Sequence, residues 1–156
     1  MMPTGQEDPD NNIMIQKYGC CLWSHWNWVE IIKGNQIFQT SETVNNEYEK
    51  LLQNGVKEID ENCTVEDGVQ LFSCYGIRVR RFYDPITKSA WISPGYKPNP
   101  GQIIILCFHW QKDDKTEYIH FAPGTINKAV LADPIARGSN TIKNGYLHSL
   151  RLYDLI

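Results

Sequence analysis

Apolar residues recur at helical spacing through the first half of the chain. From Cys20 to Ile32 they cover most of the helix circumference, which predicts a central helix that is buried on most sides. Gly34 is a natural C-terminal stop for that helix. A second helix is expected from Ser41 to about Asn54, with Thr40 or Ser41 as its N-cap, and a third, shorter one from Thr64 to Tyr75.

After Gly76 the pattern changes to period two and to β-branched and aromatic residues, which is typical of strands. Clusters of Pro, Gly, Asn and Asp separate the apolar segments and predict turns. Helices followed by an antiparallel meander indicate an α+β domain. The expected strands are residues 77–82, 102–108, 117–121, 128–132 and 146–153.

A length of 156 residues with 42% hydrophobic content is sufficient for one compact core, so we expect one domain. Residues 1–12 are polar, acidic and rich in turn formers, and we expect a disordered tail there, with the domain over residues 13–156. That start does not resemble a secretion signal. The longest strongly apolar run, residues 103–108, is too short to cross a bilayer. We therefore expect no membrane association and a cytoplasmic location.

The net charge limits the classes of partner, and the cysteine content indicates the redox state of the thiols. The net charge is −3, and the one basic cluster is Arg78, Arg80 and Arg81, so no broad surface for nucleic acid is predicted. Five cysteines form an odd set without a disulfide-framework spacing, and two of them are adjacent. Reduced thiols are the better interpretation.

Two of those thiols lie where a Tyr-Gly turn meets the central helix. The stretch Tyr18-Gly19-Cys20-Cys21 places a sulfur at a helix N-terminus, where free N–H groups and the helix dipole stabilise a thiolate. A cysteine nucleophile also needs a histidine base and a group that orients it.

His120 and Asp133 are the candidates for that pair. His120 lies near the end of one expected strand, and Asp133 directly follows the next one. If the two strands pair, the imidazole and the carboxylate come within reach of each other. Gln16 precedes Cys20 by four residues, and its carboxamide could fold back across the turn as a donor to an oxyanion.

Together, Gln16-x3-Cys20, His120-Phe121 and Asp133-Pro134 resemble the papain-like cysteine peptidases of the C39 group, which process bacteriocin precursors and have many small stand-alone relatives in bacteria. The resemblance extends from about Ile13 to the C-terminus. It implies a helical half that carries the cysteine, packed on an antiparallel sheet that carries the histidine and aspartate. It also implies Cys20 as nucleophile, His120 as base, Asp133 as orienting residue, Gln16 as oxyanion donor, and no cofactor.

Alternatives remain at the residue level and at the level of function. Cys21 could be the nucleophile, although it lies one step into the helix on an apolar face; Cys20 follows the turn glycine directly. A metal site of either cysteine with His25 lacks a second ligand pair, so no metal is expected. His109 is expected to be structural, and nothing in the sequence pairs with His148.

The leading hypothesis is a cysteine peptidase or amide hydrolase that acts on a peptide or small amide. The alternative is an inactive papain-like binding module, of a kind a phage could use, that sequesters a small anionic molecule or inhibits a partner protein.

Overall fold

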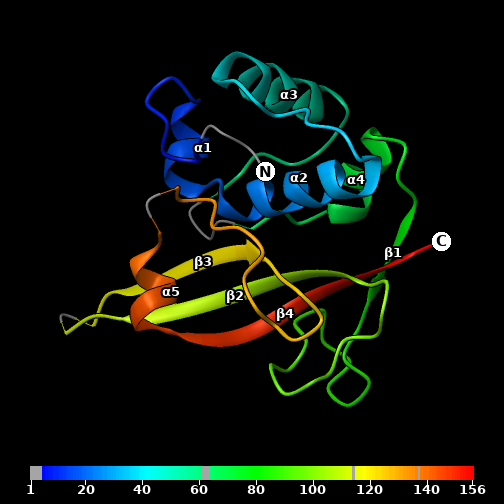
Figure 1. Cartoon of the computed structure of the whole chain (residues 1–156), viewed down its shortest axis with the longest axis vertical. Helices are drawn as coiled ribbons and strands as arrows, with labels where there is room; N and C mark the ends of the chain where they lie inside the picture. Colours follow the sequence, from blue (N-terminus) through cyan, green and yellow to red (C-terminus); the bar gives the residue numbers. More distant parts are fainter. Residues whose placement is uncertain (1–4, 61–63, 114, 137) are drawn as a thin grey trace.

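The computed structural model describes residues 5–60, 64–113, 115–136 and 138–156, and within them five helices and four strands (Figure 1). The α+β prediction is confirmed. In the part of the chain described, no helix has the length and apolar character required to cross a membrane. The helices are α1 (Ile13–Tyr18), α2 (Cys20–Lys33), α3 (Ser41–Gln53), α4 (Gly68–Cys74) and α5 (Asn140–Asn144), and the strands are β1 (Val79–Phe82), β2 (Ile103–Gln111), β3 (Glu117–Pro123) and β4 (Tyr146–Leu155).

The four strands form one antiparallel sheet in the order β1-β4-β2-β3. The expectation of a simple meander is therefore wrong: only β2 and β3 form a hairpin, and the C-terminal strand β4 lies between β1 and β2. This arrangement leaves β3 at one edge of the sheet. Helix α2 packs against that edge strand, so the two elements expected to carry the chemistry are neighbours.

Side chains alternate between the two faces of the sheet and build two apolar clusters. On one face Ile103, Ile105 and Cys107 pack with the residues of α1 to α4, which Figure 1 shows on one side of the sheet. On the other face Ile104 and Leu106 pack with β4 residues and with side chains from the connecting loops. The helical layer thus covers one face, and loops cover much of the other.

The start and the end of α2 each depend on a glycine. At its end Gly34 adopts the left-handed conformation with φ 68°, as the sequence predicted. At its start Gly19 lies so close to the preceding helix that a Cβ there would come within 2.4 Å of the Ile15 carbonyl oxygen. The Tyr-Gly turn is therefore a tight junction between α1, which the sequence did not predict, and α2.

Several strand ends shift by two or three residues, and larger differences from the sequence prediction occur at α4, at residues 128–132 and at α5. Helix α4 begins at Gly68 rather than Thr64, because the Asp67 side chain caps it by accepting from the Gln70 N–H. Residues 128–132 are not a strand; a single bridge between Gly124 and Val130 is what forms there. Residues 140–144 are a short helix whose N-cap is Ser139, where we expected a turn.

Residues 5–12, expected to belong to a disordered tail, instead pack against the domain. Gln6 and Asn11 are buried, and the Gln6 N–H donates to the Pro134 carbonyl oxygen at 2.8 Å. Asn45 on α3 accepts from the Asn12 N–H. Residues 5–12 therefore pack with the domain that was expected to begin at residue 13; residues 1–4 of the expected tail lie outside the described residues.

Candidate functional site

His120 and Asp133 lie together, as the sequence predicted. The ring Nε2 of His120 is 2.8 Å from Oδ1 of Asp133, and the histidine side chain is almost fully buried. Because a carboxylate only accepts hydrogen bonds, Nε2 carries the proton that is donated to it. The neutral ring then has its lone pair on Nδ1, which is the nitrogen that can act as a base.

The two residues meet by a different route from the one expected. His120 is on the edge strand β3, but Asp133 belongs to a loop, since residues 128–132 form no strand. Its carboxylate is held in place by the backbone: Oδ1 also accepts from the Ile135 N–H at 3.0 Å, and Oδ2 accepts from the Ser139 N–H at 2.6 Å. A loop fixed in this way can still hold an imidazole in one orientation.

These contacts also set the charge of Asp133. Burial alone would raise the pKa of its carboxyl, but the hydrogen bond and charge of His120, together with the Ile135 and Ser139 N–H groups, outweigh it, so the pKa lies below its usual value. The aspartate is therefore ionised at neutral pH.

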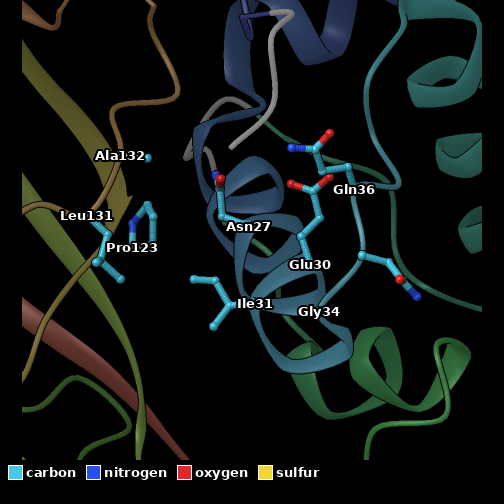
Figure 2. Close-up of a pocket in the computed structure, with 9 residues that line it drawn as sticks. Asn27, Glu30, Ile31, Gly34, Gln36, Pro123, Leu131 and Ala132 are labelled. Carbon is cyan, nitrogen blue, oxygen red and sulfur yellow. The ribbon is translucent and has the colours of Figure 1, made fainter.

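Cys20 is the first residue of α2 and is 2% exposed. At 100° per residue, Asn27 and Ile31 return to within about 20° of its direction around the helix axis. Both line a cavity of about 280 Å³ together with Pro123, Leu131 and Ala132. Figure 2 shows Asn27 and Ile31 directed from the helix toward those three residues. Cys20 thus lies on the side of α2 that faces the end of β3 and the loop leading to Asp133.

Cys21 points elsewhere, into the core between α2 and the centre of the sheet. Its sulfur is 3.8 Å from Nδ1 of His25 and 4.0 Å from a guanidinium nitrogen of Arg151, and it is fully buried. His25 cannot act as its base, because Nδ1 donates to the Cys21 carbonyl oxygen and Nε2 accepts from the Tyr153 hydroxyl.

The charge state of His25 agrees with that assignment. Burial, with the nearby positive charge of Arg151, lowers the pKa of His25 to about 3, so the ring is neutral in the folded protein at any ordinary pH. Cys21 and His25 together have the contacts of a structural pair. The two adjacent cysteines therefore differ in surroundings: Cys21 contacts His25 and Arg151, while Cys20 shares a side of α2 with Asn27 and Ile31.

Gln16 does not have the geometry that was expected of an oxyanion donor. Its carboxamide nitrogen donates to the carbonyl oxygens of Asn11 at 2.7 Å and Pro9 at 3.3 Å, so it ties α1 to the N-terminal segment. Both of its N–H groups have acceptors there.

Gln6 is a residue that the sequence analysis did not select, because it lies inside the presumed tail. It is 3% exposed, and its Nε2 donates to the Gln16 carbonyl oxygen, one helical turn before Cys20. Its backbone N–H contacts Pro134, the residue after Asp133. Its Oε1 is buried without a hydrogen-bond partner among the described residues. Gln6 thus lies between the start of α2 and the Asp133 loop; its acidic, turn-rich surroundings gave no sequence signal.

Comparisons with known proteins give a family but no chemistry. The family model named DUF261, a protein of unknown function, matches residues 2–155. None of the curated proteins and none of the solved structures matches the chain.

Proposed function

Because the chain belongs to the DUF261 family, whose description assigns no activity, we propose its function from the site: a papain-like cysteine peptidase or amide hydrolase. In this proposal Cys20 is the nucleophile, His120 the base and Asp133 the residue that positions it. The substrate class is a peptide or a small amide, and the reaction is placed in the cytoplasm.

The observation that carries the proposal is the buried His120–Asp133 pair, whose histidine is on the strand that packs against α2. A histidine whose Nε2–H is fixed by a carboxylate has its basic nitrogen oriented and its imidazolium stabilised, which is the arrangement that cysteine and serine nucleophiles require. The short distance and the backbone donors to Asp133 support a positioned base rather than a surface ion pair.

The course of α2 along β3 supports Cys20 as the nucleophile. Helix and strand run in the same direction in Figure 1, and Asn27 of α2 lines the same cavity as Pro123, the last residue of β3. His120 lies three residues before Pro123, which is roughly 10 Å along the strand. Cys20 lies seven residues before Asn27, which is again roughly 10 Å along the helix axis. The two side chains are therefore expected at the same level along the groove between α2 and β3.

The site also offers the electrostatic conditions for the reaction. The N-terminus of a helix of 14 residues favours a thiolate at Cys20. We assign the oxyanion donor to Gln6 instead of Gln16. Gln6 is buried and one N–H of its carboxamide donates to the Gln16 carbonyl oxygen, so the second can serve an oxyanion, whereas both N–H groups of Gln16 donate to Pro9 and Asn11.

The chemistry then follows in two steps. The Cys20 sulfur attacks the amide carbonyl carbon, with its proton on His120, and Gln6 with backbone N–H groups holds the negative oxygen. The C–N bond breaks as His120 returns the proton to the leaving amine, which leaves a thioester on Cys20. His120 then takes a proton from water, and hydroxide attack releases the acid and the thiol.

The test compares Cys20 with Cys21. Purified protein would be treated with iodoacetamide at neutral pH and the adducts mapped by mass spectrometry, and acylation would be followed as the burst of nitrophenolate from p-nitrophenyl acetate. We expect preferential labelling of Cys20 and loss of the burst in Cys20→Ala, with a burst rate within about threefold of the parent in Cys21→Ala. Equal, slow labelling of all thiols would contradict an activated Cys20 and favour an inactive binding module of the same fold.

The two glutamines provide a matched control. Removing one oxyanion donor costs about 10²–10³ in rate in well-studied hydrolases. We expect a loss of that order in the acylation rate for Gln6→Ala, and a change within about threefold for Gln16→Ala. The reverse ranking would return the role of oxyanion donor to Gln16.

A further inference from the structure

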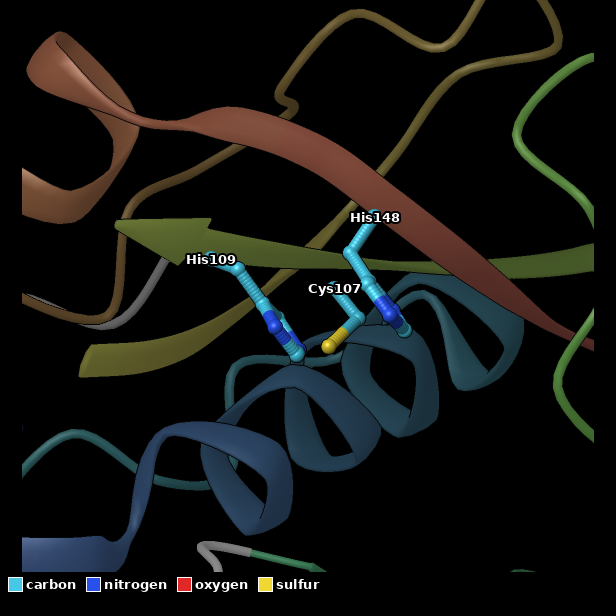
Figure 3. A group of neighbouring side chains, drawn as sticks. All are labelled: Cys107, His109 and His148. Carbon is cyan, nitrogen blue, oxygen red and sulfur yellow. The ribbon is translucent and has the colours of Figure 1, made fainter. Parts of the chain in front are cut away.

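A second group of side chains able to bind a ligand lies on the helix-facing side of the sheet, apart from the site above. It consists of Cys107 and His109 on β2 and His148 on β4, and their ligand atoms all lie within 4.8 Å of one another. Figure 3 shows the three side chains projecting from adjacent strands to the same side of the sheet. Within the described part of the chain, no other set of three such ligands comes together.

A β-bulge places the third member. Cys107 pairs with Ser149 across the sheet, but the next residue, Phe108, pairs with Leu147, so His148 is the extra residue of β4. Simple alternation from Ser149 would send the His148 side chain to the opposite face. The bulge redirects it beside His109 instead, and bulges serve this purpose next to functional sites.

The two imidazole rings are parallel and close. Their centroids are 3.8 Å apart with an interplanar angle of 3°, so the two rings are stacked face to face. One nitrogen of each ring has a local partner: Nδ1 of His109 contacts the Glu117 carboxylate at 2.8 Å, and Nδ1 of His148 contacts the Ser149 hydroxyl at 3.0 Å. This leaves Nε2 of each ring as the ligand atom.

The donor set identifies the class of ion. One thiolate sulfur and two imidazole nitrogens suit a borderline-soft divalent ion, and Zn²⁺ is the common choice for such a set. Tetrahedral Zn²⁺ requires its ligand atoms roughly 3.3–3.6 Å apart. The ligand atoms lie within 4.8 Å of one another, so binding brings them closer by about 1 Å. It also rotates one ring out of the parallel stack, so that both nitrogen lone pairs point at the ion; the His148 side chain is exposed and has room for this rotation. The Glu117–His109 contact is the carboxylate–histidine pair that commonly orients a zinc ligand.

Space for a fourth ligand lies next to the three donors. A cavity of about 350 Å³ is lined by Cys107, His109 and His148, and Trp91 and Phe121 form part of its apolar wall. Three protein ligands with an open position toward a cavity are the pattern of zinc sites that bind water or substrate, whereas structural sites use four protein ligands.

We propose that Cys107, His109 and His148 form a binding site for Zn²⁺, with Glu117 orienting His109 and a fourth coordination position open to the cavity. The site stands independently of the proposed hydrolase: it uses none of Cys20, His120 or Asp133. Its ligands face the helical layer, whereas His120 is paired with Phe108 and shares the opposite face of the sheet.

The experiment is a titration of the full, metal-stripped chain with Zn²⁺ against a chromophoric chelator, and with Co²⁺ as the spectroscopic probe. We expect one ion per chain and a sulfur-to-cobalt charge-transfer band. Cys107→Ser should abolish that band and weaken Zn²⁺ binding at least 100-fold. His148→Gln should weaken it about 10–100-fold and Glu117→Gln about 10-fold. Cys74→Ser, the matched cysteine control, should bind within twofold of the parent.

Less than one Zn²⁺ per chain at micromolar concentration in the parent protein would overturn the proposal. So would parent-like affinity in both Cys107→Ser and His148→Gln. Far-ultraviolet circular dichroism would check that each variant folds. If the buried Cys107→Ser fails that check, the exposed His148→Gln decides the question, because a surface substitution on β4 leaves the core intact.

Discussion

Cys20 and Cys21 are adjacent in sequence but have different surroundings, because successive residues of a helix point about 100° apart around its axis. Cys20 is on the side of α2 toward the β3 edge, while Cys21 contacts His25 and Arg151 in the core. Burial and the positive charge of Arg151 keep His25 neutral, and its ring bonds to the Cys21 carbonyl and to the Tyr153 hydroxyl. The contact between Cys21 and His25 is therefore structural, because both side chains are fully buried.

His25 should make folding sensitive to acid. Its pKa is about 3 when folded and close to 6.5 when unfolded, so the unfolded chain binds the extra proton below pH 6.5. The contribution to stability is complete above pH 6.5 and is lost as the pH falls toward 3, by about 1.4 kcal/mol per pH unit. Urea unfolding should show the stability gap between the parent and His25→Gln shrinking by about 2 kcal/mol from pH 7.5 to pH 5. A constant gap would contradict a neutral, buried His25.

Among the elements, the junction of α1 and α2 places the candidate nucleophile. α1 ends at Tyr18 and α2 begins at Cys20, so a single residue, Gly19, connects the two helices. Its N–H donates to the Ile15 carbonyl and its own carbonyl accepts from the Trp23 N–H, which ends one helix and begins the next. A glycine is therefore required before Cys20, because the backbone at this position lies very close to the Ile15 backbone of α1.

Gly19→Ala should destabilise the protein by about 2 kcal/mol or more, because a Cβ at 2.4 Å from the Ile15 carbonyl oxygen forces the two helices apart. Gly95→Ala is the matched control: a Cβ there meets nothing closer than the Ser93 hydroxyl at 3.9 Å, and its effect should stay within about 0.5 kcal/mol. Chemical denaturation of both variants measures the difference. Equal stabilities would show that the junction can relax.

Over the whole molecule, the N-terminal segment of residues 5–12 connects parts that are distant in sequence. It contacts α3 through Asn12 and Asn45, α1 through Gln16, and the Asp133 loop through Gln6 and Pro134. The helical layer and the Asp133 loop are therefore joined by a segment whose composition resembles a tail.

Asn11 is the internal support of that segment, since its buried Nδ2 donates to the carbonyl oxygens of Gly5 and Gln6. Asn11→Ala should cost about 1–2 kcal/mol of unfolding free energy and lower the acylation rate through displacement of Gln6. Asp10→Ala, an exposed neighbour, should change neither. Urea unfolding and hydrogen exchange over residues 5–12 would measure this; parent-like exchange in Asn11→Ala would show that the segment is held by other contacts.

Much of the fold could be predicted from local pattern. Helices α2 and α3 were predicted within a residue or so, including the Thr40 N-cap and the Gly34 stop, because periodicity and capping act within a few residues. The strands β2, β3 and β4 were also expected. The order β1-β4-β2-β3 was not, because strand neighbours are chosen by packing of the whole sheet.

The candidate site, like the fold, could be predicted from the sequence only in part. The sequence by itself determined the α+β class, the helix that begins at Cys20, and the pairing of His120 with Asp133, since residue type and spacing carry those signals. Only the tertiary structure decided that Cys20 and Cys21 have different surroundings, that Gln6 is buried in contact with Gln16 and Pro134, and that a bulge turns His148 toward Cys107 and His109. Those outcomes depend on contacts between residues tens of positions apart, and no local pattern encodes them.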